Sequence, residues 1–130
     1  MKKGYSKIVA RVFCLSLLLV LARQEALIAA SEEIPVKGMV TMIDLGAKRC
    51  IPCKMMAPIL DKLREEYAGR AAVIFLDVEK DPSLIKRFGV SAIPTQIFFD
   101  RDGKGVLRHR GFMSEKEIVE QFKKMGPTSR

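Results

Sequence analysis

Two cysteines separated by two residues, Cys50-Ile51-Pro52-Cys53, place the strongest constraint on the fold of this chain. They lie where an extended apolar run, Val40 to Leu45, gives way to an amphipathic helical pattern that starts at Lys54. A strand that leads directly into a helix puts the first sulfur at the helix N-terminus, where unpaired backbone N–H groups and the helix dipole stabilise a thiolate. The motif therefore predicts a site for thiol–disulfide exchange.

The first thirty residues have the build of an export signal. Basic residues precede an apolar stretch, Val12 to Ala22, that is broken only by Ser16. This stretch is shorter than the roughly 20 residues that a spanning helix needs, and Ala29-Ala30 offers small residues for cleavage. We expect a signal peptide over residues 1–30 and one globular domain over residues 31–130. An uncleaved membrane anchor is the alternative, and either form places the domain outside the cytoplasm because the positive charges precede the apolar run.

Downstream of the motif, apolar runs and helical patterns alternate along the chain. A parallel first half followed by a hairpin and a helix predicts an α/β domain whose mixed four-stranded sheet carries helices on both faces. Pro58 lies inside the first helical pattern and is expected to kink that helix without ending it, because the apolar stripe continues beyond it. The strands are expected at residues 39–45, 72–78, 96–100 and 106–110, and the helices from Lys54 to a stop at Gly69, from Asp81 to Gly89, and after a capping box formed by Ser114 and Glu117.

An acid, Asp44, interrupts the apolar strand that precedes the motif. A carboxylate is costly to bury, so its presence there needs a reason. From the residues alone, one explanation is an acid near a strand end that reaches solvent, and another is a functional group held beneath the cysteines.

The order of these elements resembles the thioredoxin family over residues 39–125. The residues that carry this resemblance are the redox motif with Pro52 in third place, the helix-kinking Pro58, the cis-proline loop Ile93-Pro94-Thr95, the buried acid Asp44 six residues before the first cysteine, and Gly111 after the last strand. The resemblance implies a thioredoxin-like three-layer fold. The segment before residue 39 is too short for the family's first strand and helix, so we expect the fold to be trimmed at its N-terminus.

Three departures from the family pattern surround the predicted site. Gly46 and Arg49 stand where the family has tryptophans, and Phe75 stands where it has a lysine that partners the buried acid. Positive charge at Arg49, together with its neighbour Lys48, is expected to stabilise the thiolate of the first cysteine. Loss of the lysine is expected to make Asp44 harder to ionise than in the family at large.

Other uses of the two cysteines fit the sequence poorly. A zinc site needs four ligands, and the expected mature chain offers only His109 beyond the pair. A purely structural bridge across so short a loop constrains little chain entropy. Basic runs interleaved with aromatic residues are also missing, so we expect no nucleic-acid partner. We assign His109 no role, and we expect no metal or other cofactor, since electrons pass through thiols.

The resemblance implies a mechanism and a set of site residues. Cys50 would attack a substrate disulfide, Cys53 would resolve the mixed disulfide, and Asp44 would exchange the proton of Cys53. The cis-proline loop would lie against the cysteines and dock an extended substrate chain. The substrate-binding residues are expected to be Arg49, Ile51, Pro52, Ile93 and Pro94.

Pro52 and Ile93 both resemble reducing members of the family. We therefore expect a reductase of protein disulfides that acts as a monomer and is recharged by a membrane electron shuttle of the DsbD or CcdA type, for cytochrome c maturation or disulfide repair. One alternative is a disulfide-forming oxidase, favoured by the charge at Lys48 and Arg49. Another is a non-catalytic peptide-binding module or chaperone, which the intact cysteine pair argues against.

Overall fold

A mixed four-stranded sheet lies at the centre of the domain in the computed structural model, which describes residues 33–126. The sheet order is β2-β1-β3-β4, with β1 parallel to β2 and antiparallel to β3, and with β4 antiparallel to β3. The strands are β1 (Val40–Gly46), β2 (Ala71–Asp77), β3 (Thr95–Phe99) and β4 (Gly105–Arg110). Every residue of β1 is buried, as its continuous apolar sequence predicts for a central strand.

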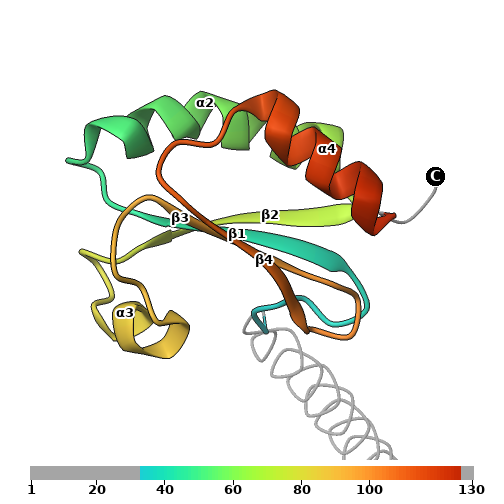
Figure 1. Cartoon of the computed structure of the whole chain (residues 1–130), viewed down its shortest axis with the longest axis horizontal. Helices are drawn as coiled ribbons and strands as arrows, with labels where there is room; N and C mark the ends of the chain where they lie inside the picture. Colours follow the sequence, from blue (N-terminus) through green and yellow to red (C-terminus); the bar gives the residue numbers. More distant parts are fainter. Residues whose placement is uncertain (1–32, 127–130) are drawn as a thin grey trace, which may run out of the picture. The chain divides into compact units, whose positions relative to one another are not determined.

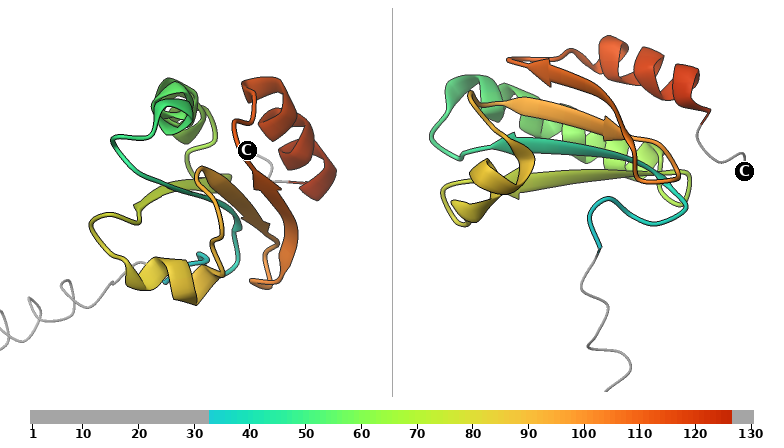
Figure 2. Two further views of the ribbon diagram at one scale, coloured as in Figure 1. Left: turned by 60° about the vertical axis from the view of Figure 1, so that its left-hand side comes forward. Right: turned by 60° about the horizontal axis from the view of Figure 1, so that its bottom comes forward.

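Helices cover both faces of the sheet and complete three layers (Figure 1). The long helix α2 (Ile51–Glu66) and the C-terminal helix α4 (Glu115–Met125) lie on one face, and the short helix α3 (Ser83–Phe88) lies on the other. Both views in Figure 2 keep this arrangement. The predicted α/β class, the mixed sheet and the three layers are confirmed. Within the described part of the chain, residues 33–39, which precede β1, form bends and turns only.

Two apolar clusters pack against the two faces of the sheet. Because side chains alternate along a strand, Met42 faces α2 and α4, whereas Ile43 and Leu45 face α3. Asp44 therefore lies on the face that α2 covers, in line with Met42 and Gly46. The α2 and α4 side is the larger cluster, built around Met42, Met56, Leu60, Leu63, Phe98, Ile118 and Phe122.

Helix α2 begins three residues earlier than predicted. Its first residue is Ile51, inside the motif, and Cys50 is its N-cap. Proline fits the first turn of a helix because its missing N–H has no partner to lose there, so Pro52 starts the helix without contributing to its apolar stripe. The helix ends at Glu66, ahead of the expected stop at Gly69, and it runs through Pro58 without ending, as predicted.

Local capping signals downstream were predicted correctly. Ser114 accepts a hydrogen bond from the Glu117 backbone N–H, and the Glu117 carboxylate accepts one from the Ser114 N–H, which completes the capping box of α4. Gly126 ends that helix in the left-handed conformation, at φ 59°. The strand limits differ from the predicted ones by about one residue, since periodicity marks a strand better than its ends.

Residues 1–30, where a signal peptide or anchor is predicted, lie outside the described residues. Within residues 33–126, no helix combines the length and apolarity that crossing a membrane would require.

Candidate active site

Cys50 and Cys53 form a disulfide at the N-terminus of α2, with their Cα atoms 5.2 Å apart. Cys50 has extended backbone, and its Sγ accepts a hydrogen bond of 3.3 Å from the Cys53 backbone N–H. The first sulfur therefore occupies the helix N-terminus, as predicted from the strand-to-helix junction. Cys50 is half-buried, whereas Cys53 is only 3% exposed and packs against the core. A large partner can reach the first sulfur far more easily than the second.

The proline loop lies at the same end of the sheet as the motif. The Ile93–Pro94 peptide bond is cis, as the family resemblance implies. Thr95, the next residue, pairs with Leu45 at the end of β1 that leads to the cysteines. The Pro94 carbonyl accepts a 2.8 Å hydrogen bond from the N–H of Gly111, whose φ of 96° favours glycine. This bond fastens the loop to the end of β4.

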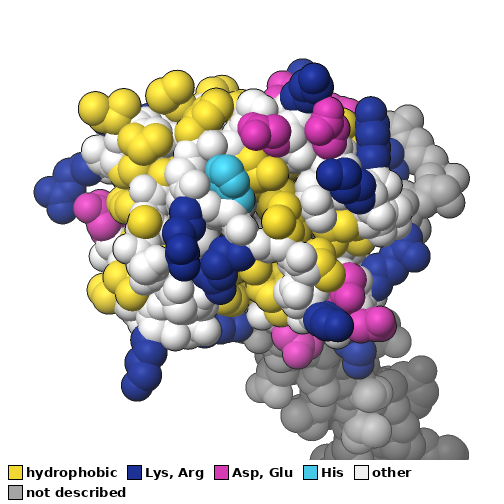
Figure 3. Space-filling view, in the orientation of Figure 1, with side chains coloured by type: hydrophobic (Ala, Val, Ile, Leu, Met, Phe, Trp, Pro, Cys, Tyr) yellow, Lys and Arg dark blue, Asp and Glu magenta, His cyan; other side chains and the backbone are white. Residues whose placement is uncertain are grey.

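Apolar surface surrounds the accessible sulfur. Ile51 is 72% exposed, and Pro52 and Ile93 are half-buried. In the space-filling view, apolar side chains gather over the α2 region of the molecule (Figure 3). Three of the predicted substrate-binding residues thus offer apolar contact area at this end of the domain, which suits an extended protein segment more than a small polar molecule.

Arg49, which was predicted to bind substrate and to stabilise the Cys50 thiolate, forms an ion pair with Glu79. Its Nε lies 3.2 Å from a carboxylate oxygen of Glu79, and its side chain is 88% exposed. The ion pair offsets part of the positive charge, and solvent screens the remainder. Arg49 therefore influences the cysteines less than an unpaired cation would.

Asp44 is fully buried, with 0% exposure, on the sheet face beneath α2. In the sheet register its neighbours are Phe75 on β2 and Gln96 on β3. Burial raises the pKa of the Asp44 carboxyl from its ordinary value of 3.8 to about 6, and the Gln96 hydrogen bond offsets only part of that rise. Asp44 is therefore harder to ionise than an ordinary carboxyl, and its burial excludes the alternative of a solvent-facing acid.

Gly46, two residues after Asp44, lies directly beside the second cysteine. A Cβ atom added to Gly46 would lie 3.1 Å from Cys53 Sγ and 3.0 Å from Cε2 of Phe75. Both distances are tighter than most real Cβ contacts, so a side chain at position 46 would require the sulfur or the ring to shift.

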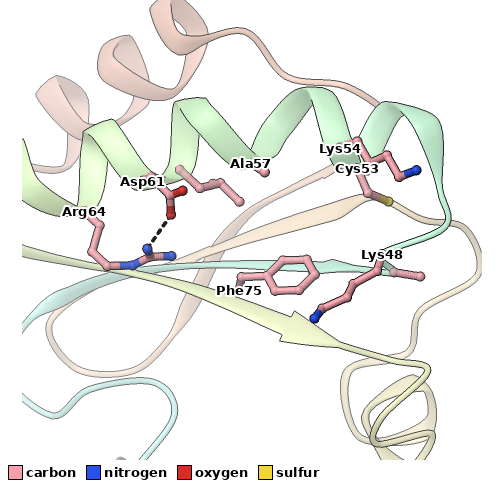
Figure 4. A pocket seen from close by; sticks show the side chains of 9 residues that line it. Lys48, Cys53, Lys54, Ala57, Asp61, Arg64 and Phe75 are labelled. Atoms are coloured by element: carbon pink, nitrogen blue, oxygen red, sulfur yellow. Dashed lines mark hydrogen bonds and ion pairs between the residues drawn. The ribbon is translucent and has the colours of Figure 1, made fainter.

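A cavity of about 410 Å³ opens beside Cys53, between α2 and the edge strand β2 (Figure 4). Phe75 and Leu60 contribute apolar walls, and Lys48 and Lys54 line it on the motif side. Arg64 closes the far end through a 2.7 Å ion pair with Asp61, drawn as a dashed line in Figure 4. The buried sulfur thus adjoins a mainly apolar space on the side where Phe75 replaces the family's lysine.

Sequence reasoning missed Gln96. Its side chain is fully buried, and Nε2 donates a 2.7 Å hydrogen bond to Oδ1 of Asp44. The sequence contains a signal for it: Gln96 is a polar residue in the apolar run that follows Pro94-Thr95, just as Asp44 is an acid in the apolar run before the motif. The opposite neighbour of Gln96 is His109 on β4, whose Nε2 lies 3.1 Å from the Phe112 carbonyl oxygen. Among residues 33–126, no three His, Cys, Asp or Glu residues are grouped as a metal site would require.

Known proteins are similar to this chain in sequence and in fold. The family model for thioredoxin matches residues 29–124. Curated thioredoxins from Staphylococcus saprophyticus subsp. saprophyticus and from Staphylococcus aureus are each 38% identical over 89 residues, which is 68% of this chain and 85% of the relative. A solved structure described as that of a malarial protein aligns with a TM-score of 0.62 and 28% identity, over 68% of this chain and 98% of the other. The chain therefore belongs to the thioredoxin family, and its Cys50–Cys53 pair makes it a thiol–disulfide oxidoreductase.

Proposed function

We propose that this chain reduces disulfides in exported proteins, with Cys50 as the nucleophile and Cys53 as the resolving thiol. The observation that carries this assignment is the unequal burial of the two sulfurs. Cys50 caps α2 and receives a backbone N–H, whereas Cys53 is 3% exposed. A helix N-terminus stabilises the thiolate that attack requires.

The reaction moves two electrons from the dithiol to the substrate. The Cys50 thiolate attacks one sulfur of a substrate disulfide, forms a mixed disulfide and releases the other sulfur as a thiolate. Asp44 then takes the proton of Cys53, and the resulting thiolate attacks Cys50 Sγ. This second step forms the Cys50–Cys53 disulfide and releases the second substrate thiolate. The acid suits this task because its pKa of about 6 is close to the working pH.

Substrate docking in this proposal uses the apolar surface beside the first sulfur. Ile51, Pro52 and Ile93 supply contact area, and the Pro94 loop, tied to Gly111, supplies a fixed edge. All of these groups come from one chain, which supports action as a monomer. Arg49, bound to Glu79 at the rim, would contact only the periphery of a substrate.

The direction of electron flow is proposed to be reducing, with a potential nearer −270 than −120 mV, the approximate limits for this superfamily. Lys48 and Arg49 favour the oxidase alternative, but exposed charges contribute about 1 kcal/mol or less. Since 30 mV corresponds to about 1.4 kcal/mol, they shift the potential by only about 20 mV.

Equilibration with glutathione or a reference thioredoxin measures this potential, and insulin precipitation measures turnover. As a matched control, Arg49→Gln should move the potential by no more than about 20 mV. A potential above about −160 mV would establish the oxidase instead. Absence of insulin reduction by the dithiol form would support the peptide-binding module.

Export is the second part of the proposal. It is supported by the basic start, the short apolar stretch and Ala29-Ala30 of the sequence. Outside the cytoplasm a dithiol is re-reduced through a membrane, so we propose a membrane electron shuttle of the DsbD or CcdA type as the electron donor. Fractionation of the native host and the mass of the mature protein should show an exported domain that begins near residue 31. Full-length protein in the cytoplasm would contradict both export and the shuttle.

A further inference from the structure

A row of four side chains crosses the sheet beneath α2 and α4. The register pairs Asp44 with Phe75 on one side and with Gln96 on the other, and it pairs Gln96 with His109. All four lie on the same face, because they stand opposite one another in the pairing. Gln96 is thus the direct polar neighbour of Asp44, and Phe75 is its apolar neighbour.

The hydrogen bond between Gln96 and Asp44 uses one carboxyl oxygen only. Gln96 Nε2 donates to Oδ1 at 2.7 Å, whereas Oδ2 of Asp44 has no hydrogen-bond partner within the described part of the chain. An amide N–H can donate to Oδ1 whether the carboxyl is ionised or carries its proton on Oδ2. The contact is therefore compatible with both protonation states, provided that the proton sits on Oδ2.

Other titratable groups lie near Asp44, within the row and on the helix above it. On β4, His109 is separated from Asp44 by Gln96 and contacts the Phe112 carbonyl oxygen. On α2, Cys53 is the titratable group that faces the sheet next to Gly46. On the side of Phe75, the charged residues that line the cavity are Lys48, Lys54, Asp61 and Arg64.

We propose that Gln96 is a positioning residue for proton exchange, because its amide holds Asp44 through Oδ1 and leaves Oδ2 to carry the proton that passes to and from Cys53. The inference rests on the proposed function, in which Asp44 serves Cys53. A neutral amide fixes the carboxyl without the charge that a lysine would bring. Burial raises the pKa of Asp44 to about 6, and the hydrogen bond from the Gln96 amide offsets part of that rise.

The test replaces the amide while keeping the length and volume of the side chain. Gln96→Met should raise the pKa of Asp44 by about one to two units, because the ionised carboxylate loses its donor. Carbon NMR of the labelled carboxyl reads this pKa directly in the oxidised protein and needs no activity. In single-turnover reactions, the rate at which Cys53 resolves the mixed disulfide should rise with pH along a limb set by the Asp44 pKa. In Gln96→Met this pH limb should move to higher pH by the same amount.

Two controls separate positioning from general damage to the fold. Phe98→Leu removes core volume on the same face of β3 and should lower stability while leaving the Asp44 pKa and the pH limb in place. His109→Gln removes the imidazole that stands opposite Gln96 on β4, and it should also leave the limb in place. If Gln96→Met does not fold, Gln96→Glu keeps the shape, and its two facing carboxyls should titrate in two separated steps.

An unchanged Asp44 pKa in Gln96→Met would overturn the proposal, and so would a shifted pKa with an unmoved pH limb. A shifted pKa with a matching limb would support it. Failure of the proposed function is a distinct result: the wild-type dithiol would then reduce no protein disulfide, while the NMR titration would still report on Gln96 and Asp44.

Discussion

Cys50→Ser should lower disulfide reductase activity by at least about 10³-fold, whereas Cys53→Ser should accumulate mixed disulfides with substrates through Cys50. Loss of a nucleophile removes the covalent route itself. Loss of the resolving thiol blocks only the second step, so the first product persists. Non-reducing electrophoresis of the variants after incubation with oxidised insulin, or after recovery from the native host, should show adducts for Cys53→Ser alone.

The double variant Cys50→Ser/Cys53→Ser is the matched control, and it should form no adduct. Alkylation of the reduced protein gives an independent measure, because Cys50 caps α2 while Cys53 is 3% exposed. Cys50 should react much faster at neutral pH. Equal alkylation rates, or adducts formed through Cys53, would contradict the assignment of the nucleophile.

The oxidised protein should become less stable as the pH rises, losing about 3 kcal/mol of unfolding free energy between about pH 3 and pH 7 through Asp44. Its pKa is about 6 in the folded chain and 3.8 as an ordinary carboxyl. Between these values the folded state binds more protons than the unfolded state, so stability falls with increasing pH. The shift from 3.8 to about 6, at about 1.36 kcal/mol per unit, gives this magnitude.

Urea unfolding of the disulfide form at a series of pH values measures this loss without interference from thiol titration. Asp44→Asn should abolish the Asp44 part of the slope, because the amide does not titrate. Glu117→Gln is a control of opposite sign: hydrogen bonds from Ser114 lower the pKa of Glu117, so that carboxylate favours the folded state as the pH rises. This control should keep the Asp44 slope. Equal slopes for wild type and Asp44→Asn would show that Asp44 ionises normally in the fold.

The two predictions address different properties of one site. The cysteine variants test which sulfur reacts. The pH series measures how much unfolding free energy the fold loses by burying the Asp44 carboxyl beneath the two cysteines. A fold that accepts an acid with 0% exposure loses stability at neutral pH. This loss of stability fits the use of Asp44 in proton exchange. A solvent-exposed acid would cost the fold less, but its lower pKa would make it a poorer proton acceptor near neutral pH.

The sequence by itself determined the fold class and the reactive pair. Apolar runs and helical patterns placed the strands and helices, and the capping box at Ser114 and Glu117 placed the start of α4, because these signals act between residues close in the chain. The cysteine motif predicted the sulfur at the helix N-terminus for the same reason. The start of α2 was wrong by three residues, since capping by Cys50 leaves no mark on the apolar stripe.

Only the tertiary structure decided that Gln96 is the hydrogen-bond partner of Asp44. Gln96 is 52 positions away along the chain and meets the acid because β3 pairs with β1. The Arg49–Glu79 ion pair and the space that Gly46 leaves for Cys53 arise in the same way. A local pattern records that a strand is buried on both faces, but the pairing register selects its neighbours, and that register depends on contacts across the whole sheet.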